Sequence, residues 1–272
     1  MSAVFDTVAS SYDDHFTFSQ IGRLQRQQVW QYLDQNLPKN QKLNILEISC
    51  GTGEDAIFFA QKGHQITATD IAPNMVKVTQ QKAIRHGFDQ QITAITSAAQ
   101  DLQNKIHLDL KYDFIFSNFG GLNCLSTKDL ESLSKVLKQA LVARQKSRFV
   151  AVIMPSFCAW ESLYFLLKLQ AKKAFRRSQK AGVLANVGST QIRTYYYSPR
   201  HFAQLFSAHF TVKTCLPIGI TLPPSYLEPF FKNKEKYLHF LYKAEKRLQH
   251  FGALAYLSDH YLIDFELNKD LD

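Results

Sequence analysis

Short apolar runs alternate with helix-periodic segments along the first 155 residues of the chain. A run that is apolar throughout predicts a strand covered on both faces, and an alternating run predicts a half-covered strand. On this pattern strands are expected at 45–48, 65–70, 91–96, 114–116 and 149–154. Helices are expected between them at 54–60, 73–86 and 130–142. Strands and helices in alternation predict an α/β fold with a mostly parallel sheet.

The first strand leads into a glycine turn at 51–53 and then into a helix with an acidic start. Glycine permits positive φ and a close approach of the backbone to a ligand. With Asp70 at the end of the next strand, the spacing nominally matches a dinucleotide fingerprint. A pyrophosphate would, however, meet the carboxylates of Glu47, Glu54 and Asp55, and like charges in a partly dehydrated cleft are costly. A ligand without phosphate but with a cationic amine or sulfonium fits this loop better.

Three motifs resemble those of class I S-adenosylmethionine (SAM) methyltransferases. They are EISCGTG at 47–53, TDIAPNM at 69–75 and YDFIFSNF at 112–119, in the family's order and spacing. One departure is Ser49, which stands where the family usually has its first glycine, and we expect a slightly altered turn with binding retained. The resemblance implies SAM as the cofactor. It also implies a Rossmann-like sheet of seven mostly parallel strands with an antiparallel last strand and helices on both faces.

The resemblance places the cofactor at the carboxyl ends of the strands. Asp70 would bind both ribose hydroxyls, with a helix N-cap as its alternative role, and Ile71 would pack on the adenine. The family often has an acid after the third strand for the adenine amino group. The nearest positions here are Ala98, Gln100 and Asp101, and the Ala99 amide with the Gln100 side chain is expected to take the place of the acid. Asp101 fits a helix start as well as it fits this contact. The expected cofactor contacts are Tyr12, Arg26, Glu47, Ser49, Cys50, Gly51, Gly53, Asp70, Ile71, Met75, Ala99, Gln100, Asn118 and Phe119.

Residues 1–36 are predicted to form a helical lid. The pattern FDxxAxxYD at 5–13 is similar to the segment that closes over SAM in many small-molecule methyltransferases. Tyr12 would then border the methyl-transfer centre, and Arg23 or Arg26 would meet the methionine carboxylate. The alternative is a helix that packs its aromatic side chains on the core and exposes its arginines.

The rest of the chain is predicted to complete the same domain. Alternation at 210–218 and 259–267 is similar to the antiparallel pair that finishes a class I methyltransferase sheet. The segments 158–198 and 222–256 are rich in aromatic residues and are predicted to cap an apolar active site. Because no internal repeat or low-complexity linker interrupts the chain, one domain is expected over 1–272.

Composition excludes several classes of protein. The chain has 272 residues, 46% of them hydrophobic, which is enough for one substantial core. No signal-like apolar segment is present, and no run approaches the ~20 apolar residues of a membrane span. The four cysteines are widely spaced with no Cys-x-x-Cys, so no metal or disulfide framework is expected. These features favour a cytoplasmic enzyme.

The formal net charge of +9 is concentrated locally. Six basic residues cluster within Lys168–Lys180, at the end of an amphipathic helix that begins near Trp160. Three interpretations remain open: a solvated face, a lid over an anionic substrate, or a weak contact with an anionic membrane surface.

The predicted reaction transfers the SAM methyl group to a small aromatic or apolar acceptor, with oxygen favoured over nitrogen or carbon. The protein must align the reactants, exclude water and, for a hydroxyl, remove a proton. The motifs do not fix this base. The candidates are His201, His209, Glu161 and Tyr195. The loop at 117–120 lacks the Asn/Asp-Pro-Pro-aromatic pattern typical of enzymes that methylate base amines, so DNA is not expected as a substrate.

Three alternative functions remain. An NAD(P)-dependent oxidoreductase could use the same kind of sheet, although the acidic loop disfavours it. A non-catalytic SAM-binding module could act as an adaptor through the basic helix. An RNA methyltransferase would rely on the overall charge alone, and it predicts a steeply salt-dependent affinity for RNA.

Overall fold

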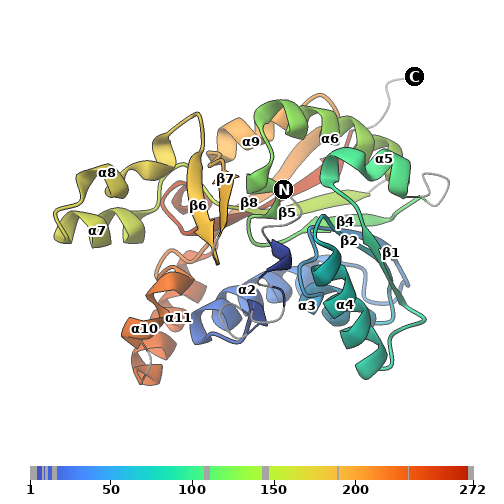
Figure 1. The fold of residues 1–272 in the computed structure, drawn as a ribbon, viewed down its shortest axis with the longest axis horizontal. Helices are drawn as coiled ribbons and strands as arrows, with labels where there is room; N and C mark the ends of the chain where they lie inside the picture. Colours follow the sequence, from blue (N-terminus) through green and yellow to red (C-terminus); the bar gives the residue numbers. More distant parts are fainter. Residues whose placement is uncertain are drawn as a thin grey trace.

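A seven-stranded sheet lies at the centre of the computed structural model, with helices above and below it (Figure 1). The structure describes residues 5–7, 9, 12–13, 17–106, 111–142, 147–188, 190–231 and 233–268. The strands lie in the order β3, β2, β1, β4, β5, β9, β8. Their bounds are β1 Asn44–Ile48, β2 Gln65–Asp70, β3 Ile92–Thr96, β4 Phe114–Ser117, β5 Arg148–Ile153, β8 Phe210–Ile218 and β9 His260–Leu267. The expected α/β, Rossmann-like fold is confirmed.

The strand directions decide which residues reach the active edge of the sheet. Strands β1 to β5 are all parallel to one another, whereas β9 is antiparallel to both of its neighbours, β5 and β8. Tyr261 pairs with Ile153 at the end of β5, and His260 pairs with Ile218 at the end of β8. The first residue of β9 therefore lies at the edge where the parallel strands end.

Neighbouring residues of one strand pack into opposite halves of the core, because side chains alternate along a strand. Ile45 joins the apolar cluster under α2, α3 and α4, and Leu46 joins the cluster under α5, α6 and α9. These helices span α2 Gln20–Asn36, α3 Glu54–Ala60, α4 Pro73–Arg85, α5 Leu102–Lys105, α6 Thr127–Ala140 and α9 Pro199–Phe206. None of the described helices has the length and apolar composition of a membrane span.

Two inserted segments, which we name the first cap (158–198) and the second cap (222–256), lie together at the left of Figure 1. The first contains α7 Ala159–Leu167, α8 Ala171–Ala174, β6 Val183–Val187 and β7 Thr190–Thr194. The second contains α10 Glu228–Phe231 and α11 Glu235–Leu248. Short 3-10 helices occur at Ala99–Asp101, Gly121–Cys124, Arg176–Ser178, Ser225–Leu227 and Gly252–Tyr256. The antiparallel β6–β7 pair was not predicted from the sequence.

Two glutamates attach the second cap to the sheet and to α2. Glu245, fully buried on α11, accepts the backbone N–H groups of residues 219–222 at 2.7–3.2 Å. Glu228 accepts the N–H groups of Gln20 and Ile21 at 2.7 and 3.0 Å, at the start of α2. A carboxylate suits both places, because these N–H groups belong to a turn and a helix start that otherwise leave donors unpaired.

Candidate active site

A cleft opens at the carboxyl edge of the sheet, beside the ends of β1, β2 and β4. The volume of the cleft that protein atoms leave empty is about 1000 Å³, and part of it is open to solvent. Of the expected cofactor contacts, those on its wall are Tyr12, Arg26, Ser49, Cys50, Gly51, Asp70, Ile71, Met75, Ala99, Gln100, Asn118 and Phe119. The structure thus brings all but two of the expected residues to one cleft. Their role in holding a cofactor stays a prediction.

The two exceptions, Gly53 and Glu47, lie behind the wall. A Cβ at Gly53 would stand 2.6 Å from Thr79 Cγ2, so this glycine allows the loop to pack against α4. Glu47 is fully buried, and its Oε2 has no hydrogen-bond partner among the described residues. Burial, reinforced by the charge of Asp55, raises the pKa of Glu47 well above its usual value. The Glu47 carboxyl is therefore ready to receive a polar or cationic partner.

Ser49 adopts the backbone conformation that glycine favours, with a φ of 59°. Its side chain fills the space that a Cβ at Gly121 would need, since such a Cβ would lie 2.4 Å from Ser49 Cβ. The turn after β1 and the loop after β4 are thus fitted to each other: serine at one position requires glycine at the other.

Asp70 holds the end of β2 against the glycine turn. Its Oδ2 accepts the Gly51 N–H and its Oδ1 accepts the Ala72 N–H, both at 2.9 Å. Burial raises the pKa of Asp70, and these backbone hydrogen bonds oppose the rise. A carboxylate has about four acceptor positions, so this side chain keeps capacity for the hydroxyl groups of a ligand.

The charge argument made from the sequence was incomplete, because the structure pairs two of its three carboxylates. Asp55 accepts hydrogen bonds from Arg26 at 2.7 Å, from Trp30 at 2.6 Å and from Asn118 at 3.0 Å. Glu54 forms an ion pair with Lys82 at 2.5 Å. The loop is therefore less negative than its sequence indicates, and the choice between ligands has to rest on other observations.

Arg26 lies on the cleft wall, whereas Arg23 is exposed and packs over Phe18. The Arg26 guanidinium also stands 5.2 Å from the centre of the Phe119 ring. Of the two arginines proposed for a ligand carboxylate, only Arg26 is in position.

Two aspartates of the N-terminal segment dock on the cleft. Asp13 accepts a hydrogen bond from Thr52 and pairs with Lys82, both at 2.6 Å, and Asp6 accepts the Asn74 N–H at 2.8 Å. Burial opposes the Asp13 charge, but the hydrogen bonds from Lys82 and Thr52 outweigh it and lower the Asp13 pKa. Residues 1–4, 8, 10–11 and 14–16 of the predicted lid lie outside the described residues.

None of the four proposed bases is on the cleft wall as far as the structure describes it. His201 is exposed on α9, and His209 follows that helix half-buried. Tyr195 lines a second pocket, which adjoins the cleft because both are lined by Cys124 and Ile192. Glu161 is buried between Arg176 and Arg177, and although burial opposes its charge, these arginines lower its pKa. A carboxylate held by two guanidinium groups is a poor proton acceptor.

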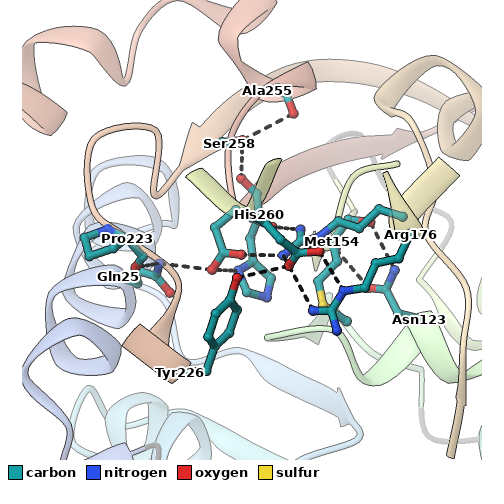
Figure 2. Close-up of polar contacts among 12 residues, drawn as sticks. Gln25, Asn123, Met154, Arg176, Pro223, Tyr226, Ala255, Ser258 and His260 are labelled. Carbon is teal, nitrogen blue, oxygen red and sulfur yellow. Dashed lines mark hydrogen bonds and ion pairs between the residues drawn. The ribbon is translucent and has the colours of Figure 1, made fainter. Parts of the chain in front are cut away.

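Sequence reasoning missed a chain of polar contacts that ends at His260 (Figure 2). Arg177 bridges Glu161 at 3.0 Å and Asp259 at 2.8 Å, and Asp259 Oδ2 lies 3.1 Å from His260 Nδ1. Burial opposes the charge of Asp259, but His260 and Arg177 lower its pKa. The His260 ring packs edge-on against Phe119, with ring centres 5.5 Å apart, and Phe119 lines the cleft. The antiparallel direction of β9 was the signal that would have placed His260 at this edge.

Further wall residues without an assigned role in the sequence analysis are Phe5, Thr52, Ser97, Gly120, Gly121, Cys124, Leu125 and Ile192. Ile192 comes from β7, so the first cap contributes to the cleft.

Residues 45–143 match the family described as "Methyltransferase domain". The match includes the glycine turn at 51–53, Asp70 and the loop after β4. Its match to a tRNA 5-carboxymethoxyuridine methyltransferase of Escherichia coli (strain K12) is 32% identical over 113 residues, which are 41% of this chain and 42% of that protein. Its match to a malonyl-[acyl-carrier protein] O-methyltransferase of Bacillus cytotoxicus is 31% identical over 138 residues, 49% of this chain and 43% of that protein. The chain thus spans less than half the length of these two relatives.

Solved structures resemble this chain in fold over most of its length. The CcbJ methyltransferase from Streptomyces caelestis aligns with a TM-score of 0.64 at 12% identity, over 98% of each chain. The magnesium protoporphyrin IX methyltransferase (ChlM) from Synechocystis, with bound SAH, aligns with a TM-score of 0.56 at 16% identity, over 92% of this chain and 85% of that one. Fold and domain family together support the class I, SAM-dependent methyltransferase that the motifs predicted.

Proposed function

We propose that this methyltransferase transfers the methyl group of SAM to an oxygen atom of a small, apolar or aromatic acceptor. The observation that carries the proposal is the cleft, with its glycine turn, Asp70 and Arg26, on a sheet whose sixth strand is antiparallel. The common dinucleotide-binding sheet has the order 3-2-1-4-5-6 with parallel strands. The reversed β9 therefore favours a methyltransferase over an oxidoreductase.

The wall residues fit the parts of SAM. Asp70 would bind the ribose hydroxyls, and Ile71 with Ala99 and Gln100 would surround the adenine. Arg26 would meet the methionine carboxylate, since its Nε has no hydrogen-bond partner among the described residues. The unpaired Glu47 Oε2 suits a nearby ammonium group, directly or through water. Bound SAM would supply an activated methyl group on its sulfonium.

The acceptor would lie against apolar side chains of the wall, which include Phe119, Leu125 and Ile192. Two relatives are named as malonyl-[acyl-carrier protein] O-methyltransferases, which supports oxygen as the methylated atom. Another is named demethylmenaquinone methyltransferase, which supports an apolar acceptor. The protein would orient this acceptor and exclude water around it.

For a hydroxyl acceptor our candidate for the proton acceptor is His260, which is not itself on the described wall but packs against the wall residue Phe119. Its Nδ1 lies 3.1 Å from Asp259 Oδ2 without forming a hydrogen bond, and the Asp259 carboxylate would stabilise the positive charge of a ring that has accepted a proton. Arg177 donates to Asp259 Oδ1 at 2.8 Å, and Gln25 donates at 3.3 Å to Oδ2, the oxygen nearest His260. A carboxylate acceptor would not need this step, because it carries no proton at neutral pH.

Calorimetric titration with SAM, S-adenosylhomocysteine, NADH and NADPH tests the cofactor. We expect binding of the two adenosyl ligands only, weakened at least 10-fold in Asp70→Asn because charge-assisted hydrogen bonds to the ribose are lost. Asp101→Asn, which changes an exposed acid next to the wall, is the matched control and should bind as the wild type does. Tight binding of a nicotinamide cofactor instead would overturn the proposal.

Rates of methyl transfer to panels of phenols and carboxylic acids test the acceptor and the base. With a phenol, His260→Asn should lower kcat by about 10²–10⁴-fold. With a carboxylate acceptor the same substitution should leave kcat nearly unchanged. The surface variant His201→Asn should have the kcat of the wild type with both the phenol and the carboxylate acceptors. Equal activity of His260→Asn on phenols would refute its role.

A further inference from the structure

The two caps hold all of the protein's net positive charge. They contain 13 of the 32 Lys and Arg residues but only four of the 23 Asp and Glu residues, which accounts for the whole excess of +9. The rest of the chain is balanced. Arg177 is buried against two carboxylates, but Lys168, Lys172 and Lys173 are exposed on the first cap, as are Lys243 and Lys246 on the second.

The same caps carry most of the exposed large apolar side chains that the structure describes. In the first cap, Leu163, Leu166, Leu167, Leu169 and Phe175 are 44–94% exposed within 13 residues of sequence. The exposed apolar residues of the second cap are Tyr226, Phe230, Tyr237, Phe240, Phe251 and Tyr256. The caps touch each other, because the Tyr164 ring contacts the rings of Tyr226 and Phe230 at 6.4 and 6.1 Å.

Leu169 is the most informative of these residues. It is 94% exposed and follows α7 with a φ of 56°. Glycine is the common residue in this left-handed position after a helix, and a leucine there costs backbone strain. Neither packing nor local backbone preference accounts for a leucine at this position, so its exposed side chain points to a partner outside the fold.

We propose that the two caps form a docking surface for an anionic lipid bilayer. Exposed leucines and aromatic rings would enter the interface between headgroups and acyl chains, and the surrounding lysines would meet anionic headgroups. The first cap also supplies Ile192 to the cleft, so docking would bring the cleft wall close to molecules dissolved in the membrane. This inference goes beyond the proposed reaction, because it requires no activity.

A bilayer fits these observations better than a nucleic acid. Phosphate contacts with RNA need cations and polar groups, and they leave Leu167 and Leu169, at 77% and 94% exposure, without a role. An interfacial membrane site needs both kinds of side chain on one surface. The two partners therefore predict different responses to removal of leucine and of lysine.

Flotation and sedimentation of the full protein with vesicles test the proposal. We expect binding to phosphatidylglycerol/phosphatidylcholine vesicles and little binding to pure phosphatidylcholine. Replacement of Lys168, Lys172 and Lys173 by glutamine should weaken partitioning on the order of 100-fold, since each cation near an anionic surface contributes about 1 kcal/mol. The matched control replaces three exposed cations outside the caps, Lys77, Arg85 and Lys135, and should bind as the wild type does.

The apolar contribution needs its own pair of variants. Leu167→Ser should weaken partitioning about 10-fold, whereas Ile84→Ser on α4, a similarly exposed position at 67%, should not. Leu169→Gly should also weaken partitioning yet keep or raise thermal stability, because it removes the strained residue. That combination separates a binding role from a structural one.

Three results would overturn the proposal. The first is absence of binding to anionic vesicles. The second is an equal loss of vesicle binding in the cap variants and in their controls. The third is tight binding of tRNA, without vesicle binding, that the lysine variant abolishes and the leucine variants leave unchanged. None of these results depends on SAM titration or methyl transfer, so the docking surface and the proposed function can fail separately.

Discussion

The contact between Ser49 and Gly121 allows a sharp test of how the cleft is built. In Gly121→Ala the new Cβ would stand 2.4 Å from Ser49 Cβ and 2.8 Å from its Oγ, so one of the two loops must move. Overpacking of this kind costs about 1–3 kcal/mol. In Ser49→Gly the obstacle is gone, and the next nearest atom to the new Cβ is Ser117 Oγ at 3.8 Å, an ordinary contact.

Ser49→Gly by itself should have a small effect. It removes the backbone strain of a serine in the left-handed conformation, about 1–2 kcal/mol. A new glycine also increases the conformational entropy of the unfolded chain, which lowers stability by about 0.4–1 kcal/mol. We therefore expect unchanged or slightly increased stability. The alanine substitution should then cost about 1–3 kcal/mol in the wild type and nearly nothing in the Ser49→Gly background.

Urea denaturation of the wild type, both single variants and the double variant measures this coupling. SAM affinity of the same four proteins should follow the same order, since both residues line the cleft. If Gly121→Ala costs the same in the wild type and in the Ser49→Gly background, within the ~0.5 kcal/mol typical of independent sites, the two loops are not fitted to each other and the reasoning is refuted.

Buried and paired charges give three further predictions. Asp13→Asn should destabilise the protein by about 1 kcal/mol at pH 7, since the charge-assisted bond to Lys82 is lost. Folding lowers the Asp13 pKa, so the stability difference between wild type and variant should be largest above the ordinary pKa near 3.9. It should shrink as the pH falls through the pKa of the folded protein. Glu245→Ala should cost about 3 kcal/mol or more in urea denaturation, because the N–H groups of 219–222 lose their buried acceptor. Arg177→Met should cost about 3–5 kcal/mol by the same measurement, since it removes the guanidinium that bridges the buried carboxylates Glu161 and Asp259. A loss below about 1 kcal/mol would contradict the buried network.

The sequence predicted the sheet well because its strands carry strong local signals. The run at 45–48 became β1 Asn44–Ile48, and the alternation at 210–218 became β8 over the same residues. The β6–β7 pair was missed because it buries little: of β7 only Ile192 and Thr194 are buried, and of β6 no residue is. A half-exposed hairpin leaves a weak pattern.

The sequence predicted some residues of the candidate site and missed others for the same reason. Motif residues such as Asp70 reached the cleft because their place at the end of a strand is encoded locally. The Asp259–His260 pair was missed because its partners, Arg177 and Gln25, are far away in sequence and meet it only in the folded chain. For the same reason the sequence grouped Arg177 with the basic cluster at 168–180 and did not predict that it is buried.

The position of β9 has a consequence for how the chain folds. This strand is made after all the other described strands, yet it lies between β5 and β8. Until residue 267 has left the ribosome, the nascent chain holds β5, buried along its whole length in the native state, with one unpaired edge. Such an edge can pair with another chain. Late closure of the sheet therefore makes nascent or C-terminally shortened chains the most aggregation-prone forms of this protein, and chaperones that shield strand edges should act before β9 docks.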